Sequence, residues 1–476
     1  MPEKKKFHVI VIGAGPGGTL LARECANRGI RVTLYEKGTY KKLGHDWSDA
    51  VERSAIEAAG FPIPERRDGQ WHGRYVKDDS GRGLYEPHAV DKLTVYSPDY
   101  SSAKMITFKM ITLDRQNFAQ LLADQAKEAG ADIQYGFSGT SLLYRETGKE
   151  SLDGVEVYGV KIKNEATGEE SEVTADLVVE SSGFSSVLRT SLPAYTGIAD
   201  PFKKSDFAIV HREVRKLDRK LTETDIYPDH YRYGFFTGYQ WTHVHSDGRI
   251  DVGAGVQNKE SNPDPEDLIK ECISRHPSIL KEKIRGGRSL CIVGLPLKSF
   301  VTNGFMILGD AAATSVPTTG CGAGSAMFAA LWAIPSIEAS ANKGRADIST
   351  LWGLNKAFYL DNTRGSHIAA LSALRVILQT LTHEELNFLF NKDIMDEASL
   401  ESAINGVYVK PSLRQMIKTL TRGITHPSTL ATLSRANSEG NKMLAHYKKY
   451  PAAYDSEKYA EWKKGADEIF HEAPEN

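Results

Sequence analysis

Apolar runs and glycines alternate in a regular order at the start of the chain. Residues 7–12 (Phe-His-Val-Ile-Val-Ile) form a continuous apolar run, as a strand buried on both faces of a parallel sheet requires. After a glycine cluster comes a segment that predicts a helix with Leu20, Leu21 and Cys25 facing inward. A second apolar run at residues 31–35 predicts another strand. The pattern therefore predicts a β-α-β unit.

The glycines between the first strand and the helix match the GxGxxG pattern of dinucleotide-binding turns. Gly13 permits the tight turn, Gly15 lets the backbone approach a pyrophosphate, and Gly18 lets helix and strand pack closely. The pyrophosphate would lie at the helix N-terminus, at Pro16 and Gly17. This turn predicts contacts between the backbone and a phosphate group.

Glu36 and Lys37 follow the second predicted strand and complete the dinucleotide site. A carboxylate at this place can accept hydrogen bonds from a ribose. A β-α-β unit without a nucleotide is the alternative. Strand, glycines, helix, strand and acid all occur in the required order, and this favours a bound dinucleotide.

Two segments in the middle of the chain resemble the flavoprotein hydroxylase and geranylgeranyl reductase families. Residues 113–118 (Leu-Asp-Arg-Gln-Asn-Phe) resemble the segment that places an arginine, here Arg115, beside FAD. Residues 175–189 look like the families' strand, glycine and Ser-x-x-Arg passage, with Gly183 as the glycine. Ser182 stands where an aspartate usually precedes it.

A third segment extends the resemblance to the flavin ring. Residues 304–312 match the families' strand followed by Gly309-Asp310, and the resemblance places this aspartate on the ribityl chain of FAD. The next run is similar to the Pro-x-x-Gly-x-Gly passage that brings a helix N-terminus to the flavin. Backbone N–H groups there would stabilise negative charge on the reduced ring. The members of this run are Pro317, Gly320, Gly322, Ala323 and Gly324.

The resemblance implies an α/β protein in which a Rossmann-type FAD-binding domain is interleaved with an antiparallel-sheet substrate domain, followed by a helical C-terminal region. The expected FAD-binding parts are residues 1–85, 106–190 and 296–345. The substrate domain takes residues 86–105, as an excursion, and 191–295. The helical region covers residues 346–476.

Short alternating strands between the second and third FAD-binding parts predict an antiparallel sheet over the flavin. The segment containing Tyr239 and Trp241 resembles the Tyr-x-Trp passage of the geranylgeranyl reductase group. Alternate side chains face one side of a strand, so both could line an apolar cavity; a plain core role is equally open. The expected strands cover residues 207–214, 231–240, 241–245 and 249–256.

The loop after the second strand offers candidate proton donors. Prenyl reductases commonly carry a cysteine there, whereas this chain reads His45-Asp46-Trp47. His45 could protonate a substrate carbanion while Asp46 sets its tautomer. A loop cap with a satisfied histidine is equally open. Cys321, within the glycine run, is either a catalytic candidate near the flavin or a small packing residue.

Charge and cysteine usage narrow the partners and the compartment. The chain has 59 basic and 61 acidic residues, a formal charge of −2, which predicts no nucleic-acid partner. Its 4 cysteines lack metal-ligand spacing, so we expect no metal site and a reducing, cytoplasmic compartment. Apolar stretches all fall short of the roughly 18 to 20 residues that span a bilayer.

A basic, helix-forming tail is the one local charge feature. Residues 410–450 contain eight Lys or Arg against one acid, a net +7. Leu413, Met416, Ile417 and Leu420 recur with helical spacing. Such a helix can lie on the inner face of a membrane and give access to a lipid or quinone. It can also dock on the protein body with its basic face solvated, which is the arrangement we expect.

The leading hypothesis is an oxidoreductase in which reduced FAD delivers hydride to a C=C bond of an apolar, prenyl or lipid-like substrate, or removes it in the reverse direction. The runner-up is an aromatic hydroxylase, in which reduced flavin activates oxygen. A third hypothesis is an electron-transfer flavoprotein that passes electrons to quinone. A halogenase fits less well because the proline of the halogenase Trp-x-Trp-x-x-Pro run is absent. The electron donor is NAD(P)H or a partner protein.

Overall fold

The nucleotide half of the protein is built on a six-stranded sheet. The computed structural model describes residues 6–78, 81–87, 89–218, 230–235, 238–245 and 248–470. All neighbouring strands of this sheet are parallel except β19 and β20, the pair at one edge. The order across the sheet is β19 (Val301–Thr302), β20 (Phe305–Ile307), β13 (Leu177–Glu180), β1 (His8–Ile12), β2 (Arg31–Glu36) and β9 (Asp132–Tyr135).

Three helices cover this sheet and carry the residues expected to bind the cofactor. Helix α1 (Pro16–Asn27) packs between α3 (Arg115–Glu128) and α7 (Ala323–Lys343). Asp114 caps α3 by accepting hydrogen bonds from the backbone N–H groups of Gln116 and Asn117. The cap fixes Arg115 as the first residue of α3. The predicted β-α-β unit is therefore confirmed, with α1 burying Leu20, Leu21 and Cys25.

Smaller elements connect the sheet to its surroundings. β10, β11 and β12 form an antiparallel sheet beside it, and β3 pairs with β8, and β4 with β5. Their bounds, with those of two short helices, are β3 (Ser48–Glu52), α2 (Arg53–Ala58), β4 (Glu65–Arg67), β5 (Gln70–His72), β8 (Met110–Asp114), β10 (Phe137–Glu146), β11 (Val155–Asn164), β12 (Glu170–Thr174) and α4 (Val187–Thr190).

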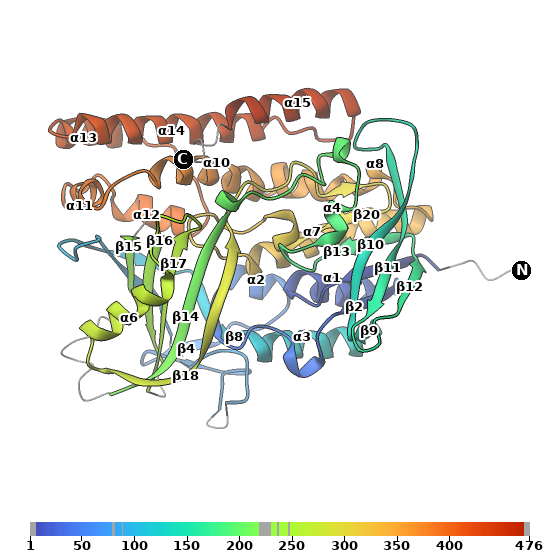
Figure 1. Ribbon diagram of the computed structural model, residues 1–476, viewed down its shortest axis with the longest axis horizontal. Coiled ribbons are helices and arrows are strands. Elements are labelled where there is room, and N and C mark those ends of the chain that lie inside the picture. The colour runs from blue at the N-terminus through green and yellow to red at the C-terminus, as the bar shows by residue number, and fades with distance from the viewer. Residues whose placement is uncertain are drawn as a thin grey trace, which may run out of the picture.

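A seven-stranded sheet faces the nucleotide half (Figure 1). It is antiparallel apart from the parallel pair β15 and β6. The expected excursion at residues 86–105 supplies β6 and part of β7. The order is β18 (Ile279–Ile292), β14 (Phe207–Leu217), β17 (Arg249–Gln257), β16 (Gly238–Val244), β15 (His230–Phe235), β6 (Lys92–Tyr96) and β7 (Ala103–Thr107), with α6 (Pro265–Arg275) packed on β14 and β17.

The strand expected at residues 231–240 is wrong. The chain reverses within it, so that β15 and β16 form an antiparallel hairpin in which Phe235 pairs with Gly238. Aromatic residues continue up to the reversal, so the pattern does not mark the turn. A Cβ at Gly238 would lie 1.8 Å from the backbone oxygen of Gly255 on β17, which explains the glycine at the start of β16.

Helices form the C-terminal region, as expected. α10 packs against α14, and α14 against α13 and α15; Figure 1 shows α13, α14 and α15 along one edge of the molecule. None of the described helices is long and apolar enough to cross a membrane. The elements are α8 (Ile348–Leu351), α9 (Gly353–Lys356), a π-helical segment (Ala357–Asp361), α10 (Arg364–Leu378), α11 (His383–Asn391), α12 (Glu397–Ile404), α13 (Leu413–Gly423), α14 (Pro427–Tyr447) and α15 (Ser456–Ile469).

Candidate active site

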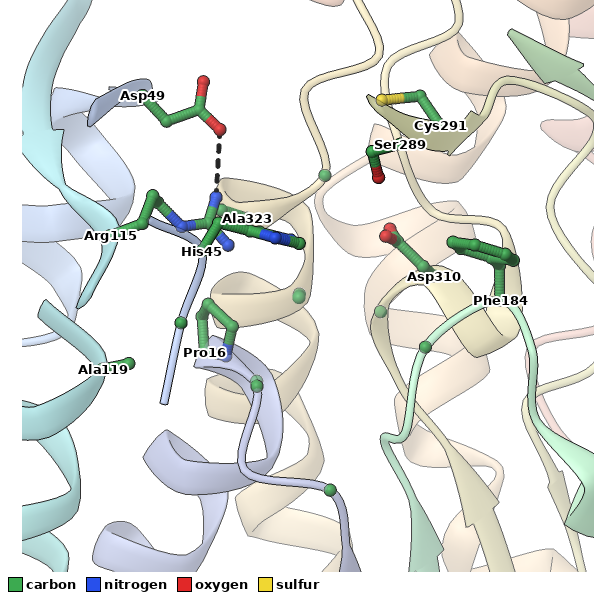
Figure 2. Close-up of a pocket in the computed structure, with 18 of the residues that line it drawn as sticks. Pro16, His45, Asp49, Arg115, Ala119, Phe184, Ser289, Cys291, Asp310 and Ala323 are labelled. Atoms are coloured by element: carbon green, nitrogen blue, oxygen red, sulfur yellow. Dashed lines mark hydrogen bonds and ion pairs between the residues drawn. The ribbon is translucent and has the colours of Figure 1, made fainter. Parts of the chain in front are cut away.

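A cavity of about 780 Å³ lies between the two large sheets. Its walls come from the β1–α1 turn, the end of β2, the loop before β3, the loop after β13, strands β16 and β18, and the start of α7. Figure 2 shows Pro16, His45 and Arg115 on one side of it, and Asp310 and Phe184 on the other. Segments that are far apart in the sequence therefore meet at one cavity.

Two helix N-termini reach this cavity. The N-cap of α1 is Gly15 and that of α7 is Gly322, and no described side chain caps either helix. Backbone N–H groups at an uncapped helix start need a hydrogen-bond acceptor, and the helix dipole favours an anion. Pro16, Gly17 and Ala323 line the cavity beside them. The site therefore has two helix starts that can each receive an anionic or electron-rich group.

The glycine turn has the geometry that its pattern predicts. Gly13 has a φ of +100°, and a Cβ there would lie 2.5 Å from the backbone oxygen of Ser181. Gly18 lies outside the cavity wall, where a Cβ would lie 2.4 Å from the oxygen of Gly13. Gly18 therefore serves the close packing of α1 on the sheet, as expected of the third glycine.

Glu36 anchors the same turn from the end of β2. Its Oε2 accepts a hydrogen bond from the backbone N–H of Ala14 at 2.8 Å, and its Oε1 one from Gly38 at 2.7 Å. Both Glu36 and Lys37 line the cavity. A carboxylate oxygen can accept more than one hydrogen bond, so Glu36 can bind a ribose while it holds the turn.

Asp310, the residue expected to bind the ribityl chain, lines the cavity opposite the glycine turn. Ser315 Oγ donates to Asp310 Oδ1 at 2.9 Å. Burial raises the pKa of this carboxyl, while the Ser315 hydrogen bond and Arg115 act against the rise. A Cβ at Gly322 would lie 2.6 Å from both Asp310 Oδ1 and Ser315 Oγ. Glycine is needed there because the start of α7 packs directly on Asp310.

The rest of the glycine run divides into lining and packing residues. Gly309, Gly320, Cys321 and Gly324 line the cavity, as does Gly183 from the loop after β13. Pro317 is buried outside the wall. The structure therefore does not place Pro317 against the flavin site, and it serves the turn that leads into α7.

Cys321 is held as a neutral thiol. Burial raises its pKa to about 12, with Asp49 adding to the rise. A thiol with such a pKa is a poor nucleophile at neutral pH because the thiolate is the reactive form. The proposed catalytic part of Cys321 is therefore limited to contact with substrate or cofactor.

A chain of ion pairs crosses from α3 to the seven-stranded sheet. Arg115 pairs with Asp49 at 3.2 Å, drawn as the dashed line in Figure 2. Asp49 also lies 3.6 Å from Arg212 on β14, and Arg212 pairs with the buried Asp251 on β17 at 2.5 Å. All four side chains line the cavity. Sequence reasoning found Arg115 and missed the other three.

Aromatic side chains surround Arg212. Its guanidinium carbon lies 5.7 Å from the ring centroids of both Trp47 and Trp241. Tyr239 and Trp241 both line the cavity, as expected of alternate positions on β16. Tyr239 Oη donates to the backbone oxygen of Thr319 at 2.5 Å, which ties β16 to the turn before α7. The aromatic wall is thus fixed against the flavin cradle.

His45 lines the cavity, but its expected partner does not. The His45 ring stacks on Trp47, with centroids 4.4 Å apart. Crowding by protein atoms and the nearby Arg115 lower the pKa of His45 to about 4, so it is neutral near pH 7. Asp46 lies outside the cavity wall and pairs with Arg285 at 3.3 Å. Asp46 therefore pairs with Arg285 and not with His45 as expected.

Glu180 at the end of β13 is expected to make stability depend on pH. Burial raises its pKa to about 7, against hydrogen bonds from Ser182, whereas the ordinary value is 4.5. The folded state therefore holds this proton more tightly than the unfolded state. The contribution of Glu180 to the free energy of unfolding should be greatest below pH 4.5 and fall by about 3 kcal/mol as the pH rises through 7.

The Glu180→Gln variant is expected to lose most of that dependence. Chemical denaturation of the wild type and the variant at pH 5 and pH 8 measures it. Glu57→Gln, at an exposed position on α2, is the control and should keep the wild-type difference. An equal fall in the Glu180→Gln protein would contradict the assignment.

Comparisons with known families agree with the cavity geometry. A family model described as an FAD binding domain matches residues 92–351. A second model, described as an NAD(P)-binding Rossmann-like domain, matches residues 11–54. The first match covers more than half of the chain, and the second contains the glycine turn and Glu36.

Full-length relatives share a modest identity with this chain. A digeranylgeranylglycerophospholipid reductase from Sulfolobus acidocaldarius is 25% identical over 480 residues, covering 99% of this chain and 98% of the relative. A protein of the same name from Methanothrix thermoacetophila is 26% identical over 426 residues, covering 87% and 95%. The similarity therefore includes the C-terminal helices.

Solved structures show the same fold. A geranylgeranyl bacteriochlorophyll reductase-like protein from Thermoplasma acidophilum superposes with a TM-score of 0.67 at 19% identity, covering 90% of this chain and 99% of that chain. A myxobacterial chondrochloren halogenase gives a TM-score of 0.58 at 16% identity, covering 98% of each chain. These similarities confirm the predicted α/β fold class.

Proposed function

The chain belongs to the FAD-binding domain family and is an FAD-dependent oxidoreductase, and from this premise we propose that it reduces a C=C bond of an apolar, prenyl or lipid-like substrate. The observation that carries the proposal is the shared cavity. Two uncapped helix starts and Asp310 meet there with the aromatic face of β16. The cavity thus has a place for the cofactor and an apolar wall for the substrate.

FAD supplies a carrier of two electrons that can pass a hydride to carbon. The residues of this chain bind and orient the reactants. Arg115 and the start of α1 bind anionic groups, and the start of α7 stabilises negative charge on the reduced ring. Tyr239 and Trp241 exclude water from one face of the cavity and present an apolar surface to the substrate.

One part of the cavity wall suits a hydrocarbon chain. Val90, Leu93 and Phe108 line it and belong to an apolar cluster that continues to Phe390 and Leu400 on α11 and α12. The names of the two relatives state that they act on a digeranylgeranyl lipid, which supports a prenyl substrate. We place reduction first; the reverse, dehydrogenation, uses the same site.

The alternative functions differ in which molecule accepts electrons from the reduced cofactor. The aromatic hydroxylase and the halogenase both require oxygen, and the similarity to a halogenase supports the latter through fold alone. Electron transfer to quinone is the third candidate. We propose that either NAD(P)H or a partner protein reduces the flavin.

Anaerobic single-turnover kinetics would separate these functions. The holoenzyme would be reduced with dithionite, NADPH or NADH, and mixed with geranylgeranyl lipids, quinones or aromatic acids without oxygen. We expect the flavin absorbance to return with the prenyl lipid, and mass spectrometry to find a product heavier by two hydrogens. Reoxidation only by oxygen, or only by quinone, would overturn the proposal. Bleaching by NADPH or NADH would identify the donor.

A glycine pair on β17 tests the part played by Trp241. The indole of Trp241 lies over Gly253, where a Cβ would come within 2.0 Å of its Cζ2. Gly253→Ala should displace Trp241 and lower the rate of flavin reoxidation by the prenyl lipid about tenfold or more, with FAD content unchanged. At Gly255, on the same strand, the nearest atom to a Cβ is 3.5 Å away. Gly255→Ala should therefore behave as wild type, and equal rates in both variants would contradict the role of Trp241.

We also propose that the protein works as a peripheral protein on the inner face of a membrane, bound through α13. The structure does not have the docked arrangement expected for this helix, because its apolar stripe faces outward. Leu413, Leu420 and Ile424 are 69%, 63% and 74% exposed. Lys418 and Arg422 instead turn toward the body, where each pairs with Asp393, at 2.8 and 3.1 Å.

The flanking charges favour an anionic lipid surface as the occupant. Lys410 and Arg414 are exposed beside the apolar stripe, and residues 402–425 contain no acid. Burial of leucines in a membrane and attraction of lysine and arginine to anionic headgroups act together in such helices. A lipid substrate would then lie in the same membrane.

Sedimentation with vesicles checks this membrane contact. The wild type should bind vesicles that contain phosphatidylserine or phosphatidylglycerol more strongly than neutral ones, and salt should weaken binding. Leu413→Ser/Leu420→Ser should lower the partition coefficient at least about tenfold, since each buried leucine contributes about 1.5–3 kcal/mol. Leu280→Ser/Ile284→Ser, at exposed apolar positions on β18, is the control. Wild-type protein that stays in the supernatant would overturn the contact.

A further inference from the structure

A buried group of charged and ring side chains lies outside the cavity wall, near the end of β16. It contains Glu86, which is fully buried, and His245, which is 2% exposed. Ser48 Oγ and Lys77 Nζ both donate to Glu86 Oε1, the latter at 2.8 Å. Lys77 also donates to Asp114 at 2.8 Å. The group is therefore anchored to the residue that caps α3.

Glu86 and His245 face each other without a completed hydrogen bond. Glu86 Oε2 lies 3.7 Å from His245 Nδ1. Neither this oxygen nor either ring nitrogen of His245 has a hydrogen-bond partner among the described residues. A buried carboxylate and a buried imidazole without hydrogen-bond partners lower the stability of the folded protein. A small movement would close a carboxylate–imidazole pair.

His243 connects this pair to the cavity. It follows Tyr239 and Trp241 at alternate positions on β16 and lines the cavity with them. Its ring centroid lies 5.0 Å from that of His245, and its Nε2 lies 3.3 Å from Thr112 Oγ1 on β8. His243 is thus the ring that the group presents to a substrate.

The outer end of the group approaches the surface. Arg249, which is 21% exposed in its side chain, lies 3.6 Å from Glu86 Oε2. Arg285 contacts Ser48 at 3.4 Å and the exposed Asp46 at 3.3 Å. Titratable and polar groups therefore continue from the cavity wall to solvent.

We propose that His243 donates the proton in the C=C reduction, with His245 and Glu86 as positioning residues that hold and restore its charge. This inference rests on the proposed function. One alkene carbon gains the hydride carried by the reduced cofactor, and the other gains a proton from a protonated nitrogen of His243. The π bond is replaced by two C–H bonds, and His243 is left neutral. Solvent returns a proton to His243, and the ionised Glu86 beside His245 favours this recharged form.

The charges around His243 suit this role. Asp251 on β17 lies directly opposite it in the strand register, and Arg212 on β14 is paired with Asp251. The Glu86 carboxylate is held ionised, because His245 and Lys77 lower its pKa against the effect of burial. Burial lowers the pKa of His245 in spite of Glu86, whereas an ionised carboxylate near His243, at the cavity wall, favours a cationic imidazole there. His45, the donor expected from the sequence, is neutral near pH 7.

Single-turnover rates of glutamine variants test the proposal. His243→Gln should slow reoxidation of the reduced flavin by the prenyl lipid about 100-fold, a usual loss for a general acid. His245→Gln and Glu86→Gln should each slow it about tenfold, and adding either to His243→Gln should have no further effect. FAD content and reduction by dithionite should stay at wild-type values in all of them.

A second histidine–glutamate pair provides the matched control. His211 and Glu213 on β14 are buried and 3.2 Å apart, in the same sheet but outside the cavity wall. His211→Gln should reoxidise at the wild-type rate. A His243→Gln rate within twofold of wild type, or an equal loss in His211→Gln, would overturn the proposal.

Histidine NMR tests the coupling without any substrate. In oxidised holoenzyme labelled with ¹³C at the histidine rings, the signal lost in His243→Gln identifies His243. Its titration midpoint should move to lower pH in Glu86→Gln and stay in place in His211→Gln. If Glu86→Gln fails to fold, His245→Gln replaces it in this titration. An unmoved midpoint would overturn the coupling. Failure of the wild type to reduce any alkene, with the midpoint shift present, would instead refute the function.

Discussion

Gly13→Ala is expected to give a protein that retains no FAD and unfolds more easily than the wild type. The φ of +100° at Gly13 is a conformation that side chains rarely adopt, and the new Cβ would lie 2.5 Å from the oxygen of Ser181. Backbone strain of this kind costs about 1–3 kcal/mol by itself, and the collision would move the turn that receives the diphosphate. Flavin absorbance after purification and denaturation of the cofactor-free protein measure the two effects.

Gly15→Ala separates cofactor binding from folding in the same turn. Gly15 has a φ of −68°, and a Cβ there would find only the oxygen of Ser181, at 3.7 Å. The cofactor-free variant should therefore unfold like the wild type. Its affinity for FAD should still fall, since the methyl group would occupy the space through which the pyrophosphate approaches the start of α1. A Gly15→Ala protein with wild-type affinity would contradict the assigned cradle.

The nucleotide half was predictable because its signal is local. The strand, the glycine turn and Glu36 lie within thirty residues of one another. Each of them meets one structural requirement of the β-α-β unit. Two more segments predicted FAD only through their resemblance to known flavoproteins. They are residues 113–118 and 304–312. The family match confirms the FAD prediction. Pro317 and Asp46 lie outside the cavity wall, and sequence spacing does not tell which side of a turn faces a cavity.

The opposite wall of the cavity could not be predicted, because its residues come together through strand pairings between distant segments. Arg212 meets Asp251 through the β14–β17 pairing, and reaches Asp49 on the other side of the cavity. A single charged residue in an alternating strand does not indicate which distant residue it will pair with. His243 was visible as the third member of the alternate series after Tyr239 and Trp241, and that signal could have identified it. The apolar stripe of α13 faces outward because Lys418 and Arg422 on its other face pair with Asp393. The sequence does not show where Asp393 lies relative to this helix.

Removal of Arg212 is expected to lower the free energy of unfolding by about 3–5 kcal/mol, because Arg212→Ala leaves a carboxylate buried without its cation. Asp251 is 1% exposed, and Arg212 holds it at 2.5 Å. The variant would also lose the cation that lies 5.7 Å from the ring centroids of both Trp47 and Trp241. Urea denaturation of the cofactor-free protein measures the stability, and the rate of flavin reoxidation by the prenyl lipid measures the effect on the wall.

Arg212→Met/Asp251→Leu tests whether the pair itself or the stranded charge sets that loss. Replacement of both members by apolar side chains of similar size should restore most of the stability, since a buried ion pair and a well-packed apolar pair are often close in free energy. Asp49 still pairs with Arg115 in this double variant, so no second carboxylate is left alone. Reoxidation by the prenyl lipid should remain slow, because Trp47 and Trp241 would have lost the group that spaces them. A double variant as unstable as Arg212→Ala would show that Arg212 acts through its aromatic contacts rather than through Asp251.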